Sequence, residues 1–321
     1  MKRWPYHPSG FSVDNCPVYL YTLISPGTLI NQWVGEMNSS FETAVSSAGS
    51  ELAKSRPSAL SNNQVNTRKE SKEYFREQEE RFEPKIKKQI RAMAQDTEFR
   101  ELSKEWAVRS IKYQYPLHFR WLGRPILQFP QDIVAMQELL WKVRPEVVVE
   151  TGIARGGTLV FYASILELLG NSADVVGIDI ALRKHNRAAL RKHPLGKKIK
   201  IIDGSSIDLD VVKQVHEYVG GRKAFVVLDS NHTHAHVLQE LTLYNDLVRR
   251  GSYLIASDTF IDDFPRGSFP NRPWDKGNNP ATAVEEFLTT NRRFKNNTNL
   301  TNKLCISACS TGYLKCVRDP K

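Results

Sequence analysis

The sequence predicts an open α/β fold of the Rossmann-like type, with a mostly parallel seven-stranded sheet that ends in an antiparallel C-terminal hairpin. The main observation is a series of five short apolar runs that each end in an acidic residue, namely Glu150, Asp179, Asp203, Asp229 and Asp258. These residues are 29, 24, 26 and 29 positions apart, about one strand–helix unit each time. Parallel strands connected in this way would carry all five carboxylates at one edge of the sheet, where open α/β folds bind ligands.

The second observation is a glycine-rich turn after the first of these strands. Val147–Val149 is a continuous apolar run, as expected for a buried parallel strand, and an apolar helix is expected over residues 159–169. Gly152 suits a tight turn, and Gly156 and Gly157 would let backbone N–H groups at the helix start approach a ligand. A strand–turn–helix without a ligand is the alternative interpretation.

The turn departs from the dinucleotide-binding fingerprint in two ways. Ala154 occupies the position of the middle glycine, where the backbone must approach a pyrophosphate. Glu150 would repel a pyrophosphate, whereas its carboxylate can accept hydrogen bonds from an ammonium or hydroxyl group. These features favour the amino-acid half of S-adenosylmethionine over a dinucleotide, and Ala154 would contribute its backbone.

The remaining elements complete a domain that we expect over residues 113–321. Helices are expected over Asp132–Trp141 and Val237–Val248, each beside a predicted strand. The closing hairpin is expected over Asn302–Ser307 and Gly312–Val317, which are apolar segments on either side of a short turn.

Two regions precede this domain. Residues 1–65 alternate prolines with stretches rich in Ser, Ala and Asn, and we interpret them as an N-terminal extension of uncertain order. Residues 66–112 are rich in Lys, Glu, Arg and Gln, and their apolar spacing predicts a helical region whose second helix covers Glu98–Ile111. Pro84 should kink or divide the first helix. These N-terminal helices are a candidate surface for a homo-oligomer.

The composition excludes several classes of protein. Of the 321 residues, 40% are hydrophobic and 25% are charged, which is typical of a soluble globular protein. We find no run of ~20 apolar residues that would predict a transmembrane helix and no signal peptide, so we expect a cytoplasmic location. The four cysteines are too few for a disulfide scaffold and are expected to be free thiols.

The formal net charge of +10 comes in large part from a basic stretch over residues 183–200. Such a stretch could face nucleic acid or an anionic glycolipid. Because no aromatic residues are interleaved for base stacking, we interpret it as a solvated helix face and do not expect nucleic acid as a partner.

Two strand ends indicate contacts to a nucleoside. Asp179 lies 22 residues after Gly157, near the spacing at which a carboxylate accepts from both hydroxyls of a ribose. Asp203 begins the turn Asp-Gly-Ser-Ser, in which Asp203 and Ser205 would meet the edge of an adenine ring. An Asx turn or a helix cap is an equally good interpretation of Asp203.

The fourth strand end is followed by the histidine-rich segment Asp229–His236. Asp229 and Asp258, at neighbouring strand ends, could hold a hard divalent cation through oxygen ligands, with Asn231 nearby. His232 would lie within reach of such a site and is our candidate catalytic base, beside Asp229. The other two histidines of the segment are interpreted as capping or packing the next helix.

The segment Phe264–Asn279 follows the fifth strand and is interpreted as a mobile lid over the acceptor. Its prolines and glycines predict an irregular loop, in which Trp274 and Lys276 would offer an aromatic face and a cation to a sugar ring. An inert surface loop is the alternative interpretation.

Four segments of the chain, in this order, resemble the cephalosporin hydroxylase/rhamnosyl O-methyltransferase family. They are Trp121–Asp132, Glu150–Thr158, Leu228–Val237 and Lys276–Val284, and the resemblance extends over residues 113–317. It implies a class I S-adenosylmethionine-dependent O-methyltransferase, in many cases with Mg²⁺, that acts on sugars of antibiotics, lipids or surface polysaccharides. The residues that the resemblance assigns are Glu150, Gly152 and Asp179 for the cofactor, and Asp229 and Asp258 for the metal region.

The chain departs from the family pattern at the metal region. The family carries acidic pairs at the fifth strand end, where this chain has Ser257 before Asp258, and it can carry an acidic residue at the position of Asn231. Fewer carboxylates imply weaker Mg²⁺ binding, because affinity depends on the charge of the ligands.

We therefore expect transfer of a methyl group from a sulfonium sulfur to a hydroxyl of a sugar or of a glycosylated small molecule, lipid or polysaccharide. The protein would align donor and acceptor and remove the hydroxyl proton, with His232 as the base and a cation lowering the pKa of the hydroxyl. The alternatives are an RNA 2′-O-methyltransferase, which would use the basic stretch, and a non-catalytic cofactor-binding relative, which would explain the smaller acidic cluster.

Overall fold

The structure is a computed structural model that describes residues 80–170 and 172–320. The predicted extension over residues 1–65, the predicted helix before residue 80 and Cys16 lie outside the described residues. The domain boundary between residues 112 and 113 stays a prediction.

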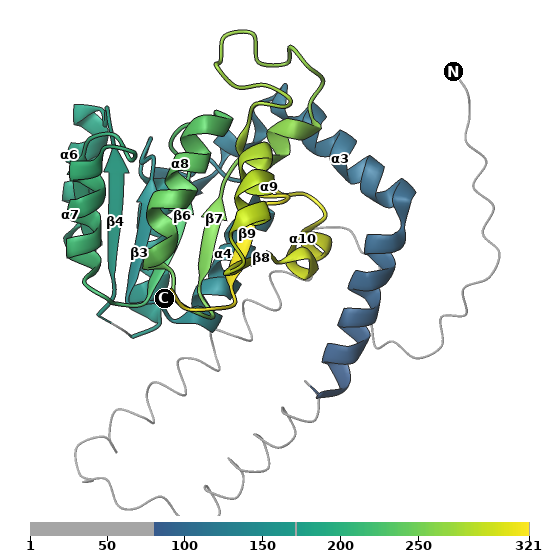
Figure 1. The fold of residues 1–321 in the computed structure, drawn as a ribbon, viewed down its shortest axis with the longest axis horizontal. Helices are drawn as coiled ribbons and strands as arrows, with labels where there is room; N and C mark the ends of the chain where they lie inside the picture. The colour runs from purple at the N-terminus through teal and green to yellow at the C-terminus, as the bar shows by residue number, and fades with distance from the viewer. Residues whose placement is uncertain (1–79, 171, 321) are drawn as a thin grey trace, which may run out of the picture. The chain divides into compact units, whose positions relative to one another are not determined.

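A seven-stranded sheet forms the centre of the described residues, in the order β5-β4-β3-β6-β7-β9-β8 (Figure 1). The strands from β5 to β7 are parallel to their neighbours, whereas β9 and β8 are antiparallel. The bounds are β3 Val147–Thr151, β4 Asp174–Asp179, β5 Ile199–Asp203, β6 Ala224–Leu228, β7 Tyr253–Ala256, β8 Phe294–Asn296 and β9 Tyr313–Cys316. The predicted Rossmann-like sheet is confirmed, and all five predicted parallel strands are present.

The strand order reverses at β3, which pairs with β4 on one side and with β6 on the other. The chain passes from β3 outward through β4 to β5, then returns to form β6 and β7 on the opposite side of β3. In open α/β sheets the crevice at the carboxyl ends of the strands at such a reversal is the usual ligand site. The residues just after β3 and β6 are therefore candidates for a ligand-binding site.

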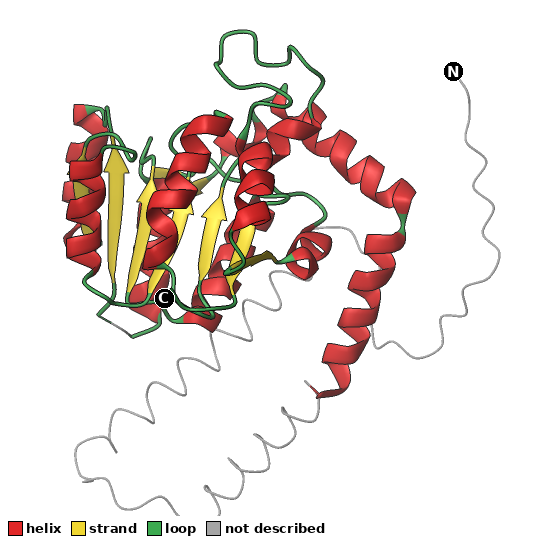
Figure 2. Ribbon diagram, in the orientation of Figure 1, coloured by secondary structure: helices red, strands yellow, loops and turns green. Residues whose placement is uncertain are grey.

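Helices cover both faces of the sheet (Figure 2). One hydrophobic cluster joins α4, α5 and α10 to one face, and a second joins α7, α8 and α9 to the other. The bounds are α3 Thr97–Ile111, α4 Pro130–Val143, α5 Gly157–Leu168, α6 Lys184–Lys192, α7 Leu209–Val219, α8 His234–Tyr244, α9 Pro280–Thr290 and α10 Thr298–Leu304. Short pieces complete the fold, namely η1 Tyr115–His118, β1 Arg120–Trp121, β2 Arg124–Pro125, η2 Gly196–Lys198, η3 Asn245–Leu247 and η4 Thr259–Asp263.

The continuous apolar run of β3 follows from this burial on both faces. Val148 packs in the first cluster, whereas Val147 and Val149 pack in the second. Successive strand residues point to opposite faces, so a strand covered on both sides needs apolar residues at every position.

The predicted C-terminal hairpin is correct in its second strand and wrong in its first. The strand that pairs with β9 at the edge of the sheet is β8, β7 pairs with β9 on its other side, and residues 302–304 belong to α10. Leu300 and Leu304 of α10 pack in the cluster that contains α4, and Lys303 pairs with Glu138 of that helix. Leu304, one of the apolar residues that suggested a strand, thus packs from a short helix, and periodicity over so few residues does not separate a helix from a strand.

The helical region before the sheet is confirmed where the structure describes it. Residues 80–95 are helical without interruption at Pro84, so the predicted division there is wrong; the break falls at Asp96, whose side chain caps α3 through the N–H of Phe99. A third hydrophobic cluster holds Val108 and Ile111 against Phe129 and neighbouring aromatic rings. The α3 helix therefore shares a core with the loops near the sheet edge.

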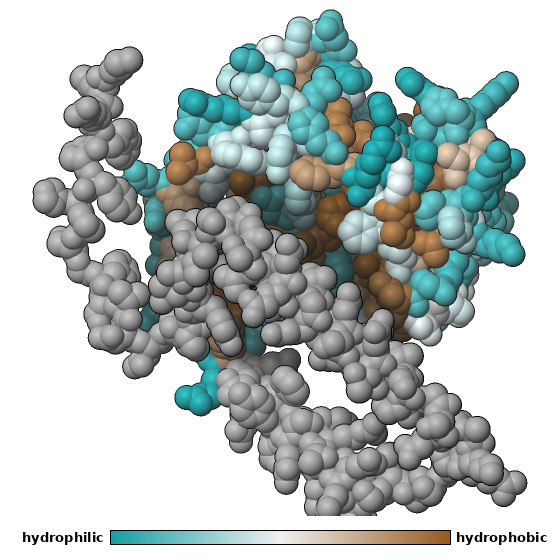
Figure 3. All heavy atoms as spheres, turned by 180° about the vertical axis from the view of Figure 1, so that it is seen from behind, coloured by the Kyte–Doolittle hydropathy of each residue, from teal (hydrophilic) through white to brown (hydrophobic). Residues whose placement is uncertain are grey.

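Between residues 80 and 320, apart from residue 171, no helix is long and apolar enough to cross a membrane. The face behind the sheet shows patches of apolar residues among hydrophilic ones (Figure 3). Of the helices in the first hydrophobic cluster, α4 exposes the large apolar side chains of Val134 and Trp141, and α5 exposes that of Leu168. Cys305, Cys309 and Cys316 are free thiols, as predicted.

Candidate functional site

Two adjoining hollows lie where the strand order reverses. Hollow A has a volume of about 310 Å³ and hollow B one of about 290 Å³, and Gly152 and Ser230 line both. Hollow A extends over the ends of β4 and β5, with Asp179, Ser205 and His236 in its wall. Hollow B extends over the glycine-rich turn, the loop around Gln128, the segment after β6, the residue Asp258 after β7, and Arg272 and Trp274.

The glycine-rich turn is as tight as predicted. Gly152 has a φ of +83°, and a Cβ atom there would lie 2.0 Å from the carbonyl oxygen of Asp229. A Cβ atom at Gly157 would lie 2.1 Å from the carbonyl oxygen of Pro125. Neighbouring backbone therefore already requires glycine at both positions. Ala154, Gly156 and Gly157 line hollow B, and their contact with a ligand stays a prediction.

Asp179 connects the turn to the end of β4. Its Oδ2 atom accepts from the N–H groups of Ile153 at 3.0 Å and Ala154 at 3.2 Å, and its Oδ1 atom accepts from the N–H of Ala181 at 2.7 Å. A carboxylate has about four lone-pair sites, so Asp179 can still accept from a ligand in hollow A. These bonds also fix its position relative to the turn.

Glu150 lies beneath the hollows and is 1% exposed. Its carboxylate accepts from the hydroxyl of Thr158 at 2.6 Å and from that of Tyr162 at 3.2 Å. Burial raises the pKa of Glu150 to about 8, against the opposing effect of these two hydrogen bonds. Thr158 lines hollow B, so the carboxylate is connected to the hollow through that hydroxyl.

The two residues predicted to contact an adenine ring, Ser205 and Asp203, lie in different surroundings. Ser205 lines hollow A, as expected for a residue that meets a base. Asp203 is exposed and forms an ion pair with Arg187 of α6. The side chain of Asp203 thus has a partner within the protein, and Arg187 comes from the basic stretch that we interpreted as a helix face.

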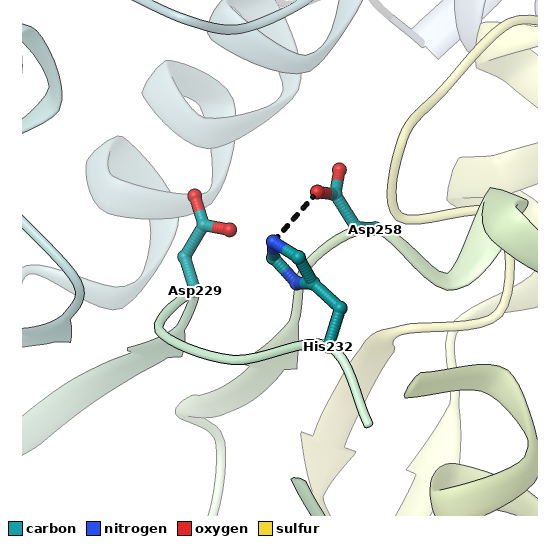
Figure 4. A group of neighbouring side chains, drawn as sticks. All are labelled: Asp229, His232 and Asp258. Atoms are coloured by element: carbon teal, nitrogen blue, oxygen red, sulfur yellow. Dashed lines mark ion pairs between the residues drawn. The ribbon is translucent and has the colours of Figure 1, made fainter. Parts of the chain in front are cut away.

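Asp229, His232 and Asp258 form a cluster in the wall of hollow B (Figure 4). One ligand atom from each residue lies within 4.8 Å of the others, and Nε2 of His232 is 3.2 Å from Oδ2 of Asp258. Burial and the neighbouring carboxylates of Asp258 and Glu150 raise the pKa of Asp229 well above its usual range. Such a cluster suits a divalent cation, because a positive ion would offset the repulsion between the carboxylates.

Gln128 and Asn231 flank the cluster in different ways. The amide Nε2 of Gln128 lies 3.4 Å from Oδ2 of Asp229, while its Oε1 atom is buried and has no hydrogen-bond partner among the described residues. Asn231 accepts from the N–H of Thr233 and lines hollow A, and it is not part of the cluster in hollow B. The structure therefore brings His232 and Gln128 to the two aspartates, while a metal-binding role of Asn231 stays a prediction.

The two residues predicted to contact the acceptor, Trp274 and Lys276, have different surroundings in the structure. Trp274 lines hollow B, where its ring meets that of His232 edge to face with centroids 4.7 Å apart. The Arg272 guanidinium lies 5.2 Å from the centre of the Trp274 ring and lines the same hollow. Lys276 donates to the carbonyl oxygen of Asp262 at 3.1 Å, which ties it to η4. Trp274 is thus in place to meet an acceptor, whereas Lys276 has a partner within the protein.

Comparison with known proteins decides the family. Residues 113–317 match the family described as Rhamnosyl O-methyltransferase/CmcI. The chain belongs to this family. Within the rhamnosyl O-methyltransferase/CmcI family, it is 32% identical over 138 residues to the rhamnosyl O-methyltransferase of Mycobacterium tuberculosis, a match that covers 42% of this chain and 54% of the relative. The relative from Mycobacterium leprae is 30% identical over 149 residues, with 45% of this chain and 62% of the relative covered.

The chain thus spans 54% to 62% of the length of these curated relatives. Among solved structures, the Mg-SAM form of CmcI has a TM-score of 0.46 and 21% identity, covering 63% of this chain and 77% of that chain. The MycE methyltransferase from the mycinamycin biosynthetic pathway, in complex with Mg, SAH and mycinamycin VI, has a TM-score of 0.38 and 16% identity, covering 57% and 46%.

The departure of this family member at the fifth strand end has a structural basis. Ser257 is buried, and its hydroxyl lies 3.9 Å from the sulfur of Cys309. Asp258 follows with a φ of +57°, a left-handed conformation that non-glycine residues seldom adopt. The chain turns sharply here, so Asp258 reaches the cluster while Ser257 remains in the core.

Sequence reasoning missed several residues around the hollows. Thr158 and Tyr162 contact Glu150, Gln128 contacts Asp229, and Ser206, Ser230 and His236 line hollow A. Thr158 and Tyr162 are four positions apart and so lie on one helical face, which is the signal that could have found them. No comparable local pattern marks Gln128, because it approaches Asp229 from 101 positions earlier in the chain.

Proposed function

We propose that this chain is an S-adenosylmethionine-dependent O-methyltransferase that acts on a hydroxyl of a sugar or of a glycosylated small molecule, lipid or polysaccharide. The observation that carries the proposal is that the cluster of Asp229, His232 and Asp258 and the glycine-rich turn line the same hollow. A methyl donor held by the turn would then face a group able to remove a proton. Membership of the rhamnosyl O-methyltransferase/CmcI family supports this assignment.

The two hollows suit the two halves of the donor. Asp179 and Ser205 would bind the nucleoside in hollow A, where the remaining lone pair of the Asp179 carboxylate can accept from a ribose hydroxyl. The backbone N–H groups of the glycine-rich turn would bind the amino-acid half in hollow B. Glu150 would act from below, by fixing the hydroxyl of Thr158.

The reaction is a displacement at a methyl carbon that the donor's sulfonium sulfur activates. The protein has to hold the acceptor oxygen in line with the methyl group and remove the hydroxyl proton. His232 is the candidate base, and the carboxylate of Asp258 at 3.2 Å would orient its ring and stabilise the imidazolium that forms.

The cluster also fits a divalent cation such as Mg²⁺. Asp229 and Asp258 supply hard oxygen ligands, and the unpartnered Oε1 of Gln128 is a further oxygen beside Asp229, while His232 stays beside them as the base. A bound cation would lower the pKa of an acceptor hydroxyl and orient it.

The acceptor would enter beside Trp274 and Arg272. An aromatic face suits the apolar side of a sugar ring, and the guanidinium adds hydrogen-bond donors next to it. A small-molecule or glycan acceptor therefore fits this wall of hollow B. A cytoplasmic location and a homo-oligomer formed through the N-terminal helices are further proposals, which rest on the sequence.

The test is a screen of sugar nucleotides and glycolipid precursors for release of S-adenosylhomocysteine, with the His232→Ala variant as the control. We expect an acceptor to release product with the wild-type chain and far less with the variant. Donor binding without turnover on any acceptor would favour a non-catalytic relative. Methylation of RNA would favour the RNA 2′-O-methyltransferase.

A further inference from the structure

Arg272 lies at one end of a row of three side chains in the wall of hollow B. Its guanidinium lies 5.2 Å from the centre of the Trp274 ring, and that ring meets the ring of His232 edge to face, with centroids 4.7 Å apart. All three side chains line hollow B. A ligand that places a hydroxyl at His232 and a sugar ring on Trp274 would therefore extend toward a guanidinium.

The loop that carries Arg272 is held by its own hydrogen bonds. This segment, Phe264–Asn279, follows η4 and projects beyond the carboxyl ends of the strands (Figure 1). The N–H of Arg272 donates to the carbonyl oxygen of Phe269 at 3.0 Å. The side-chain amide of Asn279, which is buried, donates to the carbonyl oxygen of Asp275 at 3.0 Å. The loop thus presents Arg272 from a hydrogen-bonded turn.

The carboxylates near this loop are engaged by other groups. Four of them lie between β7 and α9, namely Asp258, Asp262, Asp263 and Asp275. Asp263 pairs with Lys104 at 2.9 Å, and Asp258 lies beside His232. The other two accept from backbone N–H groups of the loop itself. In the part of the chain that the structure describes, no carboxylate forms an ion pair with Arg272.

Arg155 brings a second guanidinium to the same hollow. It belongs to the glycine-rich turn, and its side chain is exposed. Arg124 holds the backbone at this point, because its Nε donates to the carbonyl oxygen of Arg155 at 3.1 Å and its Nη2 donates to Oδ1 of Asn186 at 3.0 Å. Both acceptors are neutral. Burial, together with the charges of Arg120 and Arg155, lowers the pKa of Arg124, so this side of the hollow has an excess of positive charge.

Hollow B is therefore lined by charges of both signs. Asp229 and Asp258 make the cluster around His232 negative, whereas Arg155 and Arg272 are positive. An anionic group would be repelled by the two carboxylates and attracted by the two guanidiniums. A guanidinium offers five N–H donors in a planar fork that matches the oxygens of a phosphate. The hollow thus fits a ligand with a hydroxyl at one end and a phosphate at the other.

We infer that the acceptor is a phosphorylated sugar, whose phosphate binds Arg272 and Arg155 while its hydroxyl lies at His232. The inference rests on the proposed function, and it narrows the acceptor from any sugar to one that carries phosphate. A nucleoside diphosphate sugar and a lipid-linked sugar phosphate share this chemistry. Charge-assisted hydrogen bonds are about twice as strong as neutral ones, so the phosphate would supply a large part of the acceptor affinity.

The test is calorimetric binding of inorganic pyrophosphate to the full chain saturated with S-adenosylhomocysteine. The buffer is free of metal, so that pyrophosphate does not bind through a cation, and the bound product occupies the donor site. Arg272→Gln should weaken pyrophosphate binding at least about 10-fold, because it removes charge-assisted hydrogen bonds, and Arg155→Gln should weaken it as well. Arg272→Lys should be intermediate, since an ammonium keeps the charge without the planar fork.

The matched control is Arg266→Gln. Arg266 is an exposed arginine of the same loop that lies near Asp275 and lines neither hollow. This variant should keep the wild-type affinity for pyrophosphate. Arg272→Gln and Arg266→Gln should both bind S-adenosylhomocysteine as the wild type does, which separates loss of the phosphate contact from loss of the fold.

Competition identifies what carries the phosphate. UDP-glucose and a short-chain polyprenyl phosphoglucose are titrated against bound pyrophosphate, with methyl glucoside as the neutral probe. At least one of the two phosphorylated compounds should displace pyrophosphate, and the one that does so at the lower concentration names the carrier as a nucleotide or a lipid. Methyl glucoside should not displace it.

Three results would overturn this inference alone. The first is a chain that binds S-adenosylhomocysteine but not pyrophosphate. The second is pyrophosphate affinity that Arg272→Gln and Arg155→Gln both retain, which would mean an adventitious ion only. The third is displacement by methyl glucoside at the same concentration as by the phosphorylated compounds. A chain that does not bind S-adenosylhomocysteine would instead overturn the proposed function, and the inference with it.

Discussion

Nε2 of His232 lies 3.2 Å from Oδ2 of Asp258, and this contact holds the imidazole in the wall of hollow B. His232→Ala should therefore lower kcat by about 100-fold or more, the usual effect of losing a positioned base. Affinity for S-adenosylmethionine should change little, because the donor would rest on the turn and on hollow A. Steady-state kinetics and calorimetry check the two parts separately, and an unchanged kcat would remove His232 from the mechanism.

Removal of divalent cations should suppress turnover. Asp229 and Asp258 lie close enough to share a cation beside His232, so EDTA should inhibit and Mg²⁺ or Mn²⁺ should restore activity. Asp229→Asn should lower turnover and leave donor affinity within a few-fold. Full activity in EDTA, combined with an inactive His232→Ala variant, would mean that the histidine works without a metal.

Asp179 should determine donor affinity. Asp179→Ala removes a charge-assisted hydrogen bond to a ribose hydroxyl, worth ~1.5–3 kcal/mol, so affinity for S-adenosylmethionine should fall at least ~10-fold. Asp203→Ala is the matched control, because the exposed carboxylate of Asp203 already pairs with Arg187. Equal effects of the two substitutions on calorimetric affinity would contradict the ribose assignment.

Trp274 should matter for the acceptor and Lys276 should matter less. Trp274 lines hollow B beside His232, whereas Lys276 donates to a backbone oxygen of η4. Trp274→Ala should raise the KM for the acceptor several-fold and spare donor binding, with Lys276→Ala closer to the wild type. If Trp274→Ala loses both functions equally, the residue supports the fold and is not an acceptor contact.

Glu150 should make stability fall with rising pH. Its pKa of about 8 in the folded chain lies above the value near 4.5 expected when unfolded, so the folded state binds the extra proton between these values. The free energy of unfolding should therefore decrease as pH rises from 6 to 8, with a Glu150 contribution of about 2 kcal/mol. Glu150→Gln should flatten this dependence in denaturant titrations. Asp132, whose pKa burial raises to about 6, titrates at the lower end of this window, and Glu150→Gln leaves that contribution in place. An identical slope in the variant would contradict the assignment.

The sequence was informative where burial acts on every residue of an element. Of the five parallel strands, β3, β6 and β7 are buried at every position and β4 at all but its ends, so their apolar runs marked them correctly. The edge strand β5 exposes Lys200 and was found by its remaining apolar residues and its terminal Asp203. The sequence failed over residues 302–307, where a seven-residue helix and a strand bury similar apolar residues. Strand pairing near the end of a chain depends on distant partners, which local patterns do not encode.

Only part of the site could be predicted, because some of its residues come from distant parts of the chain. Strand ends converge by topology, so Asp229 and Asp258 could be placed together from spacing. Gln128, which contacts Asp229, could not be placed, because it arrives from another element. The same holds for Arg187, which pairs with Asp203. His236 was assigned to helix packing because the helix was expected to begin at Val237. It begins at His234, so His236 lies in its first turn, beside hollow A.

The buried carboxylate of Asp132 has a consequence for the order in which the protein can mature. At the start of α4, it accepts from Ser307 and from the backbone of Ala308, and from Tyr313 of β9 at 2.7 Å. The loop that carries Gln128 leads directly into this helix. During synthesis the amino-terminal part emerges first, so the hydrogen bond from Tyr313 to Asp132 forms only after β9 has left the ribosome. A nascent chain that ends before Tyr313 would contain the glycine-rich turn, but α4 and the loop of Gln128 would lack the hydrogen bond from Tyr313. We therefore expect binding of the methyl donor to appear only late in synthesis.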